Sequence, residues 1–207
     1  MKKLFSFFAK IFLAPIVGIF VKEVNGKENI PRSSSFIVAS NHLDGWDHYF
    51  ISFALKERLD DIHFIGALDS FKTFFLFGLL YWVSDTIVIR RTKTKREKLT
   101  PKVLKYLKKG SIIIIYPEGD TNPDKVLLKG KTGVADFVLG SGCPVLPVGV
   151  QKIENSKKRV VNIGKPLYFS KNINEIKGTD EYKQYSREIT DSIMREISKL
   201  SGKPYPY

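Results

Sequence analysis

Residues 38–50, VASNHLDGWDHYF, place two histidines and two aspartates within seven positions of one another. Four residues separate His42 from Asp47, so the two side chains can meet where a strand turns into a helix. A carboxylate that bonds one imidazole nitrogen fixes the tautomer of the ring and raises the basicity of the other nitrogen. Such a pair makes a histidine a general base for a hydroxyl nucleophile, a role worth about 10²–10⁴ in rate. It requires no serine or cysteine nucleophile from the protein. Taken alone, however, a histidine at a strand end is more often a hydrogen-bonded turn residue than a catalyst.

The same stretch also allows a metal site, because imidazole and carboxylate groups are common metal ligands. Two observations disfavour that interpretation. His63 is the only other histidine, and the chain has a single cysteine. If a helix begins near Trp46, successive side chains lie about 100° apart around it, so His48 points away from Asp47. We therefore expect no bound metal, and we expect Asp44 to be a turn or helix-cap residue.

The elements that would position these residues follow from the apolar pattern. Short apolar runs bounded by turn residues predict strands over residues 35–40, 62–66, 86–90, 111–116, 144–150 and 159–164. The segments between and after them predict helices over residues 46–59, 70–83, 96–109, 131–141 and 179–200. The run SIIIIY at 111–116 is apolar at successive positions, which is typical of a strand buried on both faces. We expect an α/β fold in which a mixed, mostly parallel central sheet is covered by helices on both faces.

Two polar clusters occur where predicted strands end. NHLDGWD follows the strand FIVAS, and PEGDTN follows the strand SIIIIY. In open α/β sheets, ligand sites lie where strands end and helices begin. Both clusters are therefore candidates for the functional site.

Length and charge narrow the class of protein. A chain of 207 residues is long enough for one well-buried domain and rather short for two. Its 34 Lys and Arg against 21 Asp and Glu give a net charge of +13. Such a charge favours a polyanionic partner, which can be nucleic acid, anionic lipid headgroups or a phosphorylated substrate. A single cysteine excludes an intramolecular disulfide.

Nucleic-acid binding is an alternative from a different functional class. The run RRTKTKREK at 90–98 holds six basic residues and one acid, and 13% of the chain is aromatic. The aromatic residues gather in apolar stretches such as FFLFGLLYWV at 74–83, however, and do not interleave with the basic run. No recognisable nucleic-acid module is present, so we expect no nucleic-acid partner.

The N-terminal segment 4–21 has eighteen residues and a single charge. As a helix it would be about 27 Å long, only just the thickness of a hydrocarbon core. Lys3, Ser6 and Lys10 fall on one side and large apolar residues on the other, which is typical of a helix that lies in the bilayer interface. A secretory signal would need a small-x-small cleavage site, which is absent. We expect residues 1–21 to be an interfacial membrane helix and 22–207 the functional domain, although a helix docked on the core is an alternative.

Several motifs occur in an order that resembles one family. Asn41 and His42 with Asp47, then YPEG at 116–119 and CPVLPVGV at 143–150, resemble the motifs of the glycerolipid acyltransferases, which include 1-acylglycerol-3-phosphate acyltransferases. The resemblance extends over residues 24–31, 86–91, 129–142 and 162–169, and so over most of the chain.

The resemblance implies transfer of an acyl group from a thioester, acyl-CoA or acyl carrier protein, to the hydroxyl of a lysophospholipid. The expected acceptor is 1-acylglycerol 3-phosphate and the product phosphatidic acid, with no metal or other cofactor. In this scheme His42 deprotonates the acceptor hydroxyl and Asp47 orients His42. The enzyme would be peripheral or monotopic on the cytoplasmic face of an anionic membrane. Glycerol 3-phosphate or another lysolipid is an alternative acceptor, and a basic membrane-binding or nucleic-acid-binding protein is the alternative class.

The resemblance also implies a set of substrate-binding residues. Arg90 or Arg91 would bind the phosphate through a bidentate guanidinium. Glu118 would shape the acceptor site by bonding to hydroxyl groups or to an arginine. A backbone N–H near Gly119 is a candidate oxyanion donor, and Asn41 completes the set.

Two departures from the family pattern concern the identity of the acceptor. After the YPEG motif the family usually continues with a small hydroxyl residue and an arginine, whereas this chain has residues 120–122, DTN. The family also commonly has a lysine where this chain has Leu68 or Asp69, and Lys72 is a possible substitute one turn away.

Overall fold

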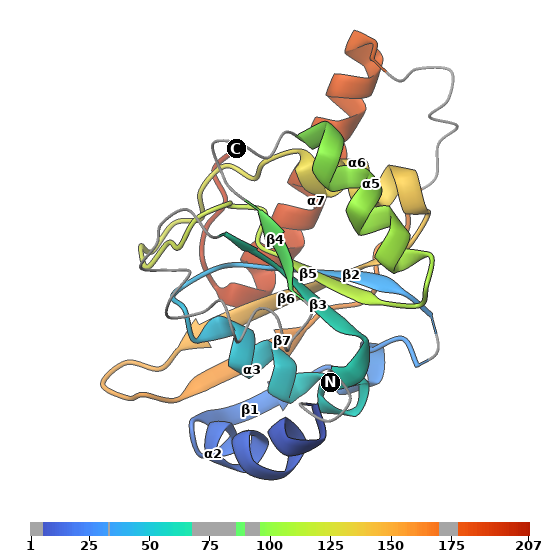
Figure 1. Ribbon diagram of the computed structural model, residues 1–207. Coiled ribbons are helices and arrows are strands. Elements are labelled where there is room, and N and C mark those ends of the chain that lie inside the picture. Colours follow the sequence, from blue (N-terminus) through green and yellow to red (C-terminus); the bar gives the residue numbers. More distant parts are fainter. Residues whose placement is uncertain (1–5, 33, 68–85, 90–95, 170–177) are drawn as a thin grey trace.

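The computed structural model describes residues 6–32, 34–67, 86–89, 96–169 and 178–207 (Figure 1). In this part of the chain, seven strands form one sheet in the order β1-β7-β6-β2-β5-β3-β4. The strands are β1 Val21–Asn25, β2 Phe36–Ser40, β3 Ile62–Ala67, β4 Ile87–Ile89, β5 Ile112–Ile115, β6 Val145–Lys152 and β7 Arg159–Ile163.

The sheet is mixed and mostly parallel, as predicted. Strands β6, β2, β5, β3 and β4 run in one direction. Strand β7 is antiparallel to β6, and β1 lies parallel to β7 at the edge. The six predicted strands are all present, but the prediction missed β1, because three of the five residues of its sequence VKEVN are polar and it is held in the sheet by pairing with β7.

Helices cover both faces of the sheet (Figure 1). Side chains of the central strands β2 and β5 alternate between the two faces. Ile113 packs in the core under α5 Arg96–Leu107, α6 Gly133–Ser141 and α7 Asp180–Ser201. Ile112 and Ile114 pack in the core on the opposite face, with α3 Asp47–Ala54. The expected burial of the β5 run on both faces is confirmed. Each face of the sheet has its own hydrophobic core, which different helices cover.

One predicted helix is shorter in the structure than expected, and another falls on residues that the structure does not describe. Helix α3 ends at Ala54 and a 3-10 helix, Lys56–Asp61, follows it where the prediction extended one helix to residue 59. Arg58 donates hydrogen bonds to the carbonyls of Pro31 and Arg32, which fixes this segment by a tertiary contact. The predicted helix 70–83 lies outside the described residues.

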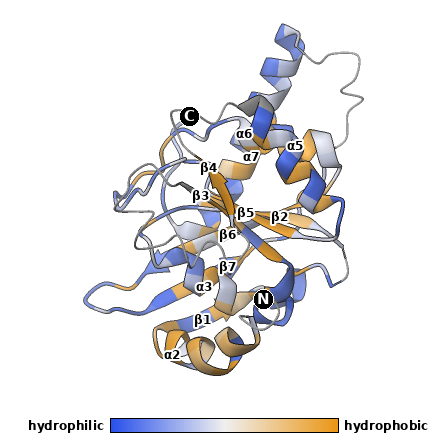
Figure 2. Ribbon diagram, viewed as in Figure 1, coloured by the Kyte–Doolittle hydropathy of each residue, from blue (hydrophilic) through white to orange (hydrophobic). Residues whose placement is uncertain are grey.

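The N-terminal segment is helical from residue 6 to residue 19, with a π-helix, Ala9–Leu13, followed by α2 Ala14–Ile19. Ser6 and Ala9 are buried against the protein, and Lys10 Nζ lies 3.5 Å from Asp60 Oδ2. These helices are largely apolar (Figure 2), and their outward side chains include Phe7, Phe8, Ile11, Phe12, Ile16, Ile19 and Phe20, which are between 37% and 67% exposed. None of the described helices combines the length and the apolar character that crossing a membrane requires.

Candidate active site

The centre of the site is the pair formed by His42 and Asp47, where β2 ends and α3 begins. His42 Nδ1 donates to Asp47 Oδ2 over 2.9 Å, and Asp47 has no exposed surface. The same carboxylate oxygen accepts the backbone N–H groups of Leu43, at 2.6 Å, and Asp44, at 3.0 Å. Three donors therefore hold the carboxylate, and the ring of His42 keeps Nε2 for a substrate proton.

Asp44 makes the tight turn between His42 and α3. Its Oδ1 accepts the backbone N–H of Trp46 at 2.8 Å, which confirms the predicted turn role. Its Oδ2 forms an unpredicted ion pair with Arg159 of β7, at 2.8 Å. The Arg159 guanidinium also lies 5.5 Å from the ring centroid of Phe50. The turn that carries His42 is thus attached to β7 and, through Arg159, to α3.

Glu118 links the loop after β5 to the loop after β2. It is 2% exposed and accepts the backbone N–H of His42 at 3.2 Å. It also accepts Asn122 Nδ2 at 2.6 Å and the Leu128 backbone N–H at 2.9 Å. In return, Asn122 donates its backbone N–H to the His42 carbonyl at 2.6 Å. These partners differ from the expected arginine or substrate hydroxyl, and they make Glu118 an anchor for the base.

Asn41 has no exposed surface, which corrects its expected role in substrate binding. Its side-chain amide donates to the Val150 carbonyl at 2.9 Å, and its Oδ1 accepts the Val150 N–H at 2.8 Å. Both polar atoms are engaged with the backbone of β6. Asn41 therefore fixes the end of β2 and does not face a ligand.

Gly119 occupies a left-handed turn with φ of 77°, which favours glycine. A Cβ atom there would also lie 2.3 Å from Lys131 Nζ. The Gly119 N–H donates to the Tyr116 carbonyl at 2.9 Å, so it is not available as the expected oxyanion donor. The predicted phosphate ligands Arg90 and Arg91 lie outside the described residues.

His48 lies beside the His42–Asp47 pair, so the prediction that it faces elsewhere was wrong. Its ring centroid is 5.5 Å from that of His42, and its Nδ1 is 2.7 Å from Tyr116 Oη. Tyr116 in turn stacks on His42, with ring centroids 4.0 Å apart and an interplanar angle of 13°. Burial, reinforced by the nearby His42, lowers the pKa of His48 from 6.5 to about 4. His48 is therefore a neutral imidazole at pH 7.

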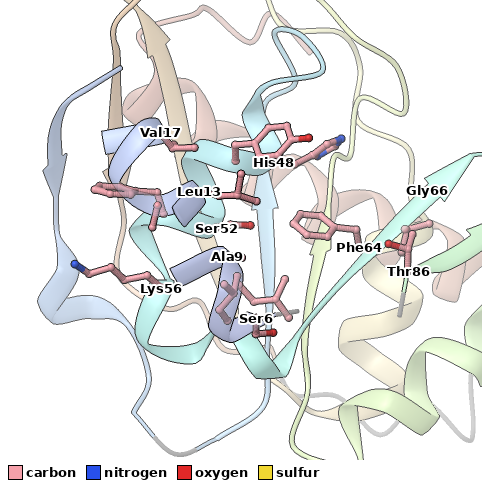
Figure 3. A pocket seen from close by; sticks show the side chains of 16 residues that line it. Ser6, Ala9, Leu13, Val17, His48, Ser52, Lys56, Phe64, Gly66 and Thr86 are labelled. Atoms are coloured by element: carbon pink, nitrogen blue, oxygen red, sulfur yellow. The ribbon is translucent and has the colours of Figure 1, made fainter. Parts of the chain in front are cut away.

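An apolar cavity of about 140 Å³ opens beside these rings. It lies between the N-terminal helices, α3 and β3, and the side chains of Leu13, His48 and Phe64 line it (Figure 3). In the residues that the structure describes, no group of three or more His, Cys, Asp or Glu side chains could hold a metal ion. The site therefore combines a histidine that is hydrogen-bonded to an aspartate with an adjacent apolar cavity.

The fold and the site define a class of α/β proteins that carry a histidine–aspartate pair at the carboxyl end of a central parallel strand. The sequence model of the acyltransferase family matches residues 21–151, which include both members of the pair and Glu118. The chain belongs to this acyltransferase family.

Curated relatives share one name. The 1-acyl-sn-glycerol-3-phosphate acyltransferase of Borreliella burgdorferi is 26% identical over 189 residues, which cover 86% of this chain and 70% of the relative. The enzyme of the same name from Haemophilus influenzae is 27% identical over 145 residues, 69% of this chain and 58% of the relative. The chain therefore spans little more than half the length of that relative.

A solved structure supports the fold. The crystal structure of the 1-acyl-sn-glycerophosphate (LPA) acyltransferase from Thermotoga maritima superimposes with a TM-score of 0.62. The match covers 98% of this chain and 88% of that one, at 20% sequence identity. At this identity the likeness establishes the α/β architecture.

Proposed function

We propose that the chain is a membrane-associated O-acyltransferase that moves a fatty acyl group from a thioester to the hydroxyl of a lysophospholipid. The names of the relatives favour 1-acyl-sn-glycerol 3-phosphate as the acceptor and phosphatidic acid as the product, a step of phospholipid biosynthesis. The observation that carries the proposal is the His42–Asp47 pair beside an apolar cavity. Acyl-CoA or acyl carrier protein would supply the acyl group, and no other cofactor enters the scheme.

The reaction follows from the geometry of the pair. His42 Nε2 takes the proton of the acceptor hydroxyl, and the hydroxyl oxygen forms a bond to the thioester carbonyl carbon. The carbonyl π electrons move to oxygen and give a tetrahedral oxyanion. When the C–S bond breaks, the leaving thiolate takes the proton from His42. Asp47 holds the ring in the required tautomer and stabilises the imidazolium that forms between the two transfers.

The cavity fits an acyl chain, because aliphatic and aromatic side chains dominate its lining. Its wall includes the N-terminal helices, whose outer side is apolar and exposed. An interfacial position of these helices would place the mouth of the cavity near lipid. Basic residues near an anionic surface contribute about 1 kcal/mol each, and the net charge of +13 supports such an anionic, cytoplasmic-leaflet partner.

Arg90 and Arg91 remain our proposed phosphate ligands. The DTN departure gives the alternative acceptors weight, because Asn122 is only 2% exposed and bonds to Glu118. A buried asparagine cannot act as the phosphate contact that the family's arginine after the YPEG motif would supply. Glycerol 3-phosphate and other lysolipids therefore belong in the first acceptor screen.

The test uses the purified chain with detergent-dispersed lysophosphatidic acid and a labelled acyl-CoA or acyl carrier protein thioester, with the lipid product identified by mass spectrometry. We expect His42→Ala to lower kcat by about 10²–10⁴, because the hydroxyl loses its base. His63→Ala is the matched control, since His63 is a buried histidine whose ring packs against Tyr106, away from the pair. Undiminished turnover in His42→Ala would contradict the mechanism.

A further inference from the structure

We propose that His48 is a second catalytic residue, whose Nε2–H donates a hydrogen bond to the oxyanion of the tetrahedral intermediate. The inference rests on the proposed acyl transfer. That reaction places a full negative charge on the former carbonyl oxygen, and a preorganised N–H donor at that point is worth about 10²–10³ in kcat. The donor must lie close to the base and must be free of other partners.

Most of the backbone N–H groups closest to the base are already engaged. The N–H of His42 is taken by Glu118, and those of Leu43 and Asp44 by the Asp47 carboxylate. Further along the loop, Asp44 Oδ1 accepts from residue 46 and the Asp44 carbonyl accepts from residue 47. In the loop after β5, the N–H groups of residues 119, 121 and 122 are likewise engaged. These N–H groups are therefore used in hydrogen bonds that hold the two loops together, and they are not available to an oxyanion.

The hydrogen bond between His48 and Tyr116 indicates which ring nitrogen of His48 carries the hydrogen, and this nitrogen is Nε2. Tyr116 Oη lies 2.7 Å from His48 Nδ1, and the described structure gives the Tyr116 hydroxyl no other acceptor. The hydroxyl therefore donates to Nδ1. A neutral imidazole that accepts at Nδ1 carries its hydrogen on Nε2.

Burial keeps the His48 ring neutral, since its pKa lies at about 4. Burial also raises the pKa of Tyr116, so this hydroxyl keeps its hydrogen. Within the described part of the chain, Nε2 makes no hydrogen bond, and it is not one of the buried side-chain atoms without a partner. The Nε2–H group consequently remains accessible to a ligand in the cavity that His48 lines.

The spacing of the two rings suits the intermediate. The attacking oxygen and the oxyanion are bonded to the same carbon, so two groups that hydrogen-bond them must lie within roughly 8 Å of each other. The ring centroids of His42 and His48 are 5.5 Å apart. As the hydroxyl proton moves to His42, the carbonyl oxygen gains charge and its bond to His48 Nε2–H strengthens. When the C–S bond breaks, the carbonyl re-forms and that hydrogen bond weakens again, while His48 keeps its proton throughout.

The experiment compares steady-state kinetics of four variants with the same acyl thioester and lysophosphatidic acid. We expect His48→Leu to lower kcat by about 10²–10³ with little change in the acceptor KM, because the hydrogen bond is much stronger to the oxyanion than to the ground-state carbonyl. The His48→Gln side chain can place an N–H near the position of Nε2, so we expect it to stay within about tenfold of wild type. Tyr116→Phe keeps the stack on His42 but frees the His48 tautomer, and should lower kcat by about tenfold.

His63→Leu is the matched control, since it removes a buried histidine that packs against Tyr106. Each variant is checked by its thermal unfolding midpoint. If His48→Leu does not fold, His48→Asn replaces it, because the shorter amide reaches the Nδ1 position and not that of Nε2. Full kcat in both the His48→Leu (or Asn) and the Tyr116→Phe variants, with active wild type, would overturn the role of His48 alone. No turnover of any acceptor by wild type would overturn the proposed function instead.

Discussion

Asp47 places one carboxylate oxygen under three donors and leaves the other, Oδ1, buried and without a partner among the described residues. Because water does not screen a buried charge, its attraction to a positive ring beside it is stronger than at the surface. In the proposed mechanism, this carboxylate would stabilise the positive ring that forms when His42 takes the hydroxyl proton. One residue would then both orient the base and stabilise the charge that the base acquires.

The other histidine of the site links pH to stability. Burial lowers the pKa of His48 from 6.5 to about 4. Between these values the unfolded chain binds a proton at His48 and the folded chain does not, so a fall in pH favours the unfolded state. Between pH 7 and pH 4 we expect this residue to cost about 3 kcal/mol of unfolding free energy.

The measurement is urea unfolding of wild type and His48→Gln at several pH values. The variant should lose less stability on acidification, by about 3 kcal/mol. Carboxylates titrate in both proteins and cancel in the difference. Parallel stability curves for the two proteins would show that His48 does not carry this effect.

At the scale of elements, the sequence predicts those features that depend on residues close together in the chain. Apolar runs such as the β5 sequence are recognisable because burial on both faces needs apolar residues at every position. The meeting of His42 and Asp47 was predictable because both lie within one turn. The contacts of His48 were not predictable. The angle between successive residues of a helix gives the direction of His48 relative to Asp47, but it does not tell which distant element His48 faces. Its partner Tyr116 is 68 residues away, and only the sheet order brings β2 and β5 together.

Glu118 couples these two elements, so its substitution should affect both stability and catalysis. Glu118→Gln keeps the size of the side chain. The carboxylate accepts hydrogen bonds from three donors, and the new NH₂ group, itself a donor, would face at least one of them. We expect a loss of about 2–3 kcal/mol in unfolding free energy, and a fall in kcat because the His42 backbone loses its anchor.

Denaturant unfolding and the acyl-transfer assay check this prediction together. Asp124→Asn is the matched control, because it makes the same carboxylate-to-amide change at an exposed position of the same loop. The control should change stability by less than about 0.5 kcal/mol. Equal effects of the two substitutions would argue against the anchoring role of Glu118.

For the molecule as a whole, the N-terminal helices combine an inner side that lines the cavity with an outer side whose apolar side chains are exposed. The sequence predicted the amphipathic character of this segment but not which side the protein would cover. The small residues Ser6 and Ala9 face inward, and the phenylalanines face outward. A helix docked only to complete the core would show the opposite arrangement.

Membrane binding should therefore depend on this outer side. The triple substitution of Phe8, Phe12 and Ile16 by serine removes three large apolar side chains that are 49–59% exposed, so the fold should keep its stability. Each such side chain contributes about 1.5–3 kcal/mol when fully buried in an apolar phase. We expect at least about a 100-fold weaker partition onto phosphatidylglycerol vesicles, measured by sedimentation.

A double variant, Tyr168→Ser with Tyr207→Ser, serves as the control, because these aromatic side chains are also exposed but lie elsewhere in the chain. It should sediment with vesicles as wild type does. If the triple variant still sediments fully, another surface holds the protein at the membrane.

The reciprocal hydrogen bonds between the His42 and Glu118 loops also bear on how the chain matures. They join residues 76 positions apart, and a contact of such separation forms only after the entropy of closing the intervening loop has been lost. A chain that has collapsed but has not paired β2 with β5 lacks the support on which the base depends. We therefore expect the proposed acyl transfer to begin only when the central strands are in register, so newly made or partly unfolded molecules should hold no competent site.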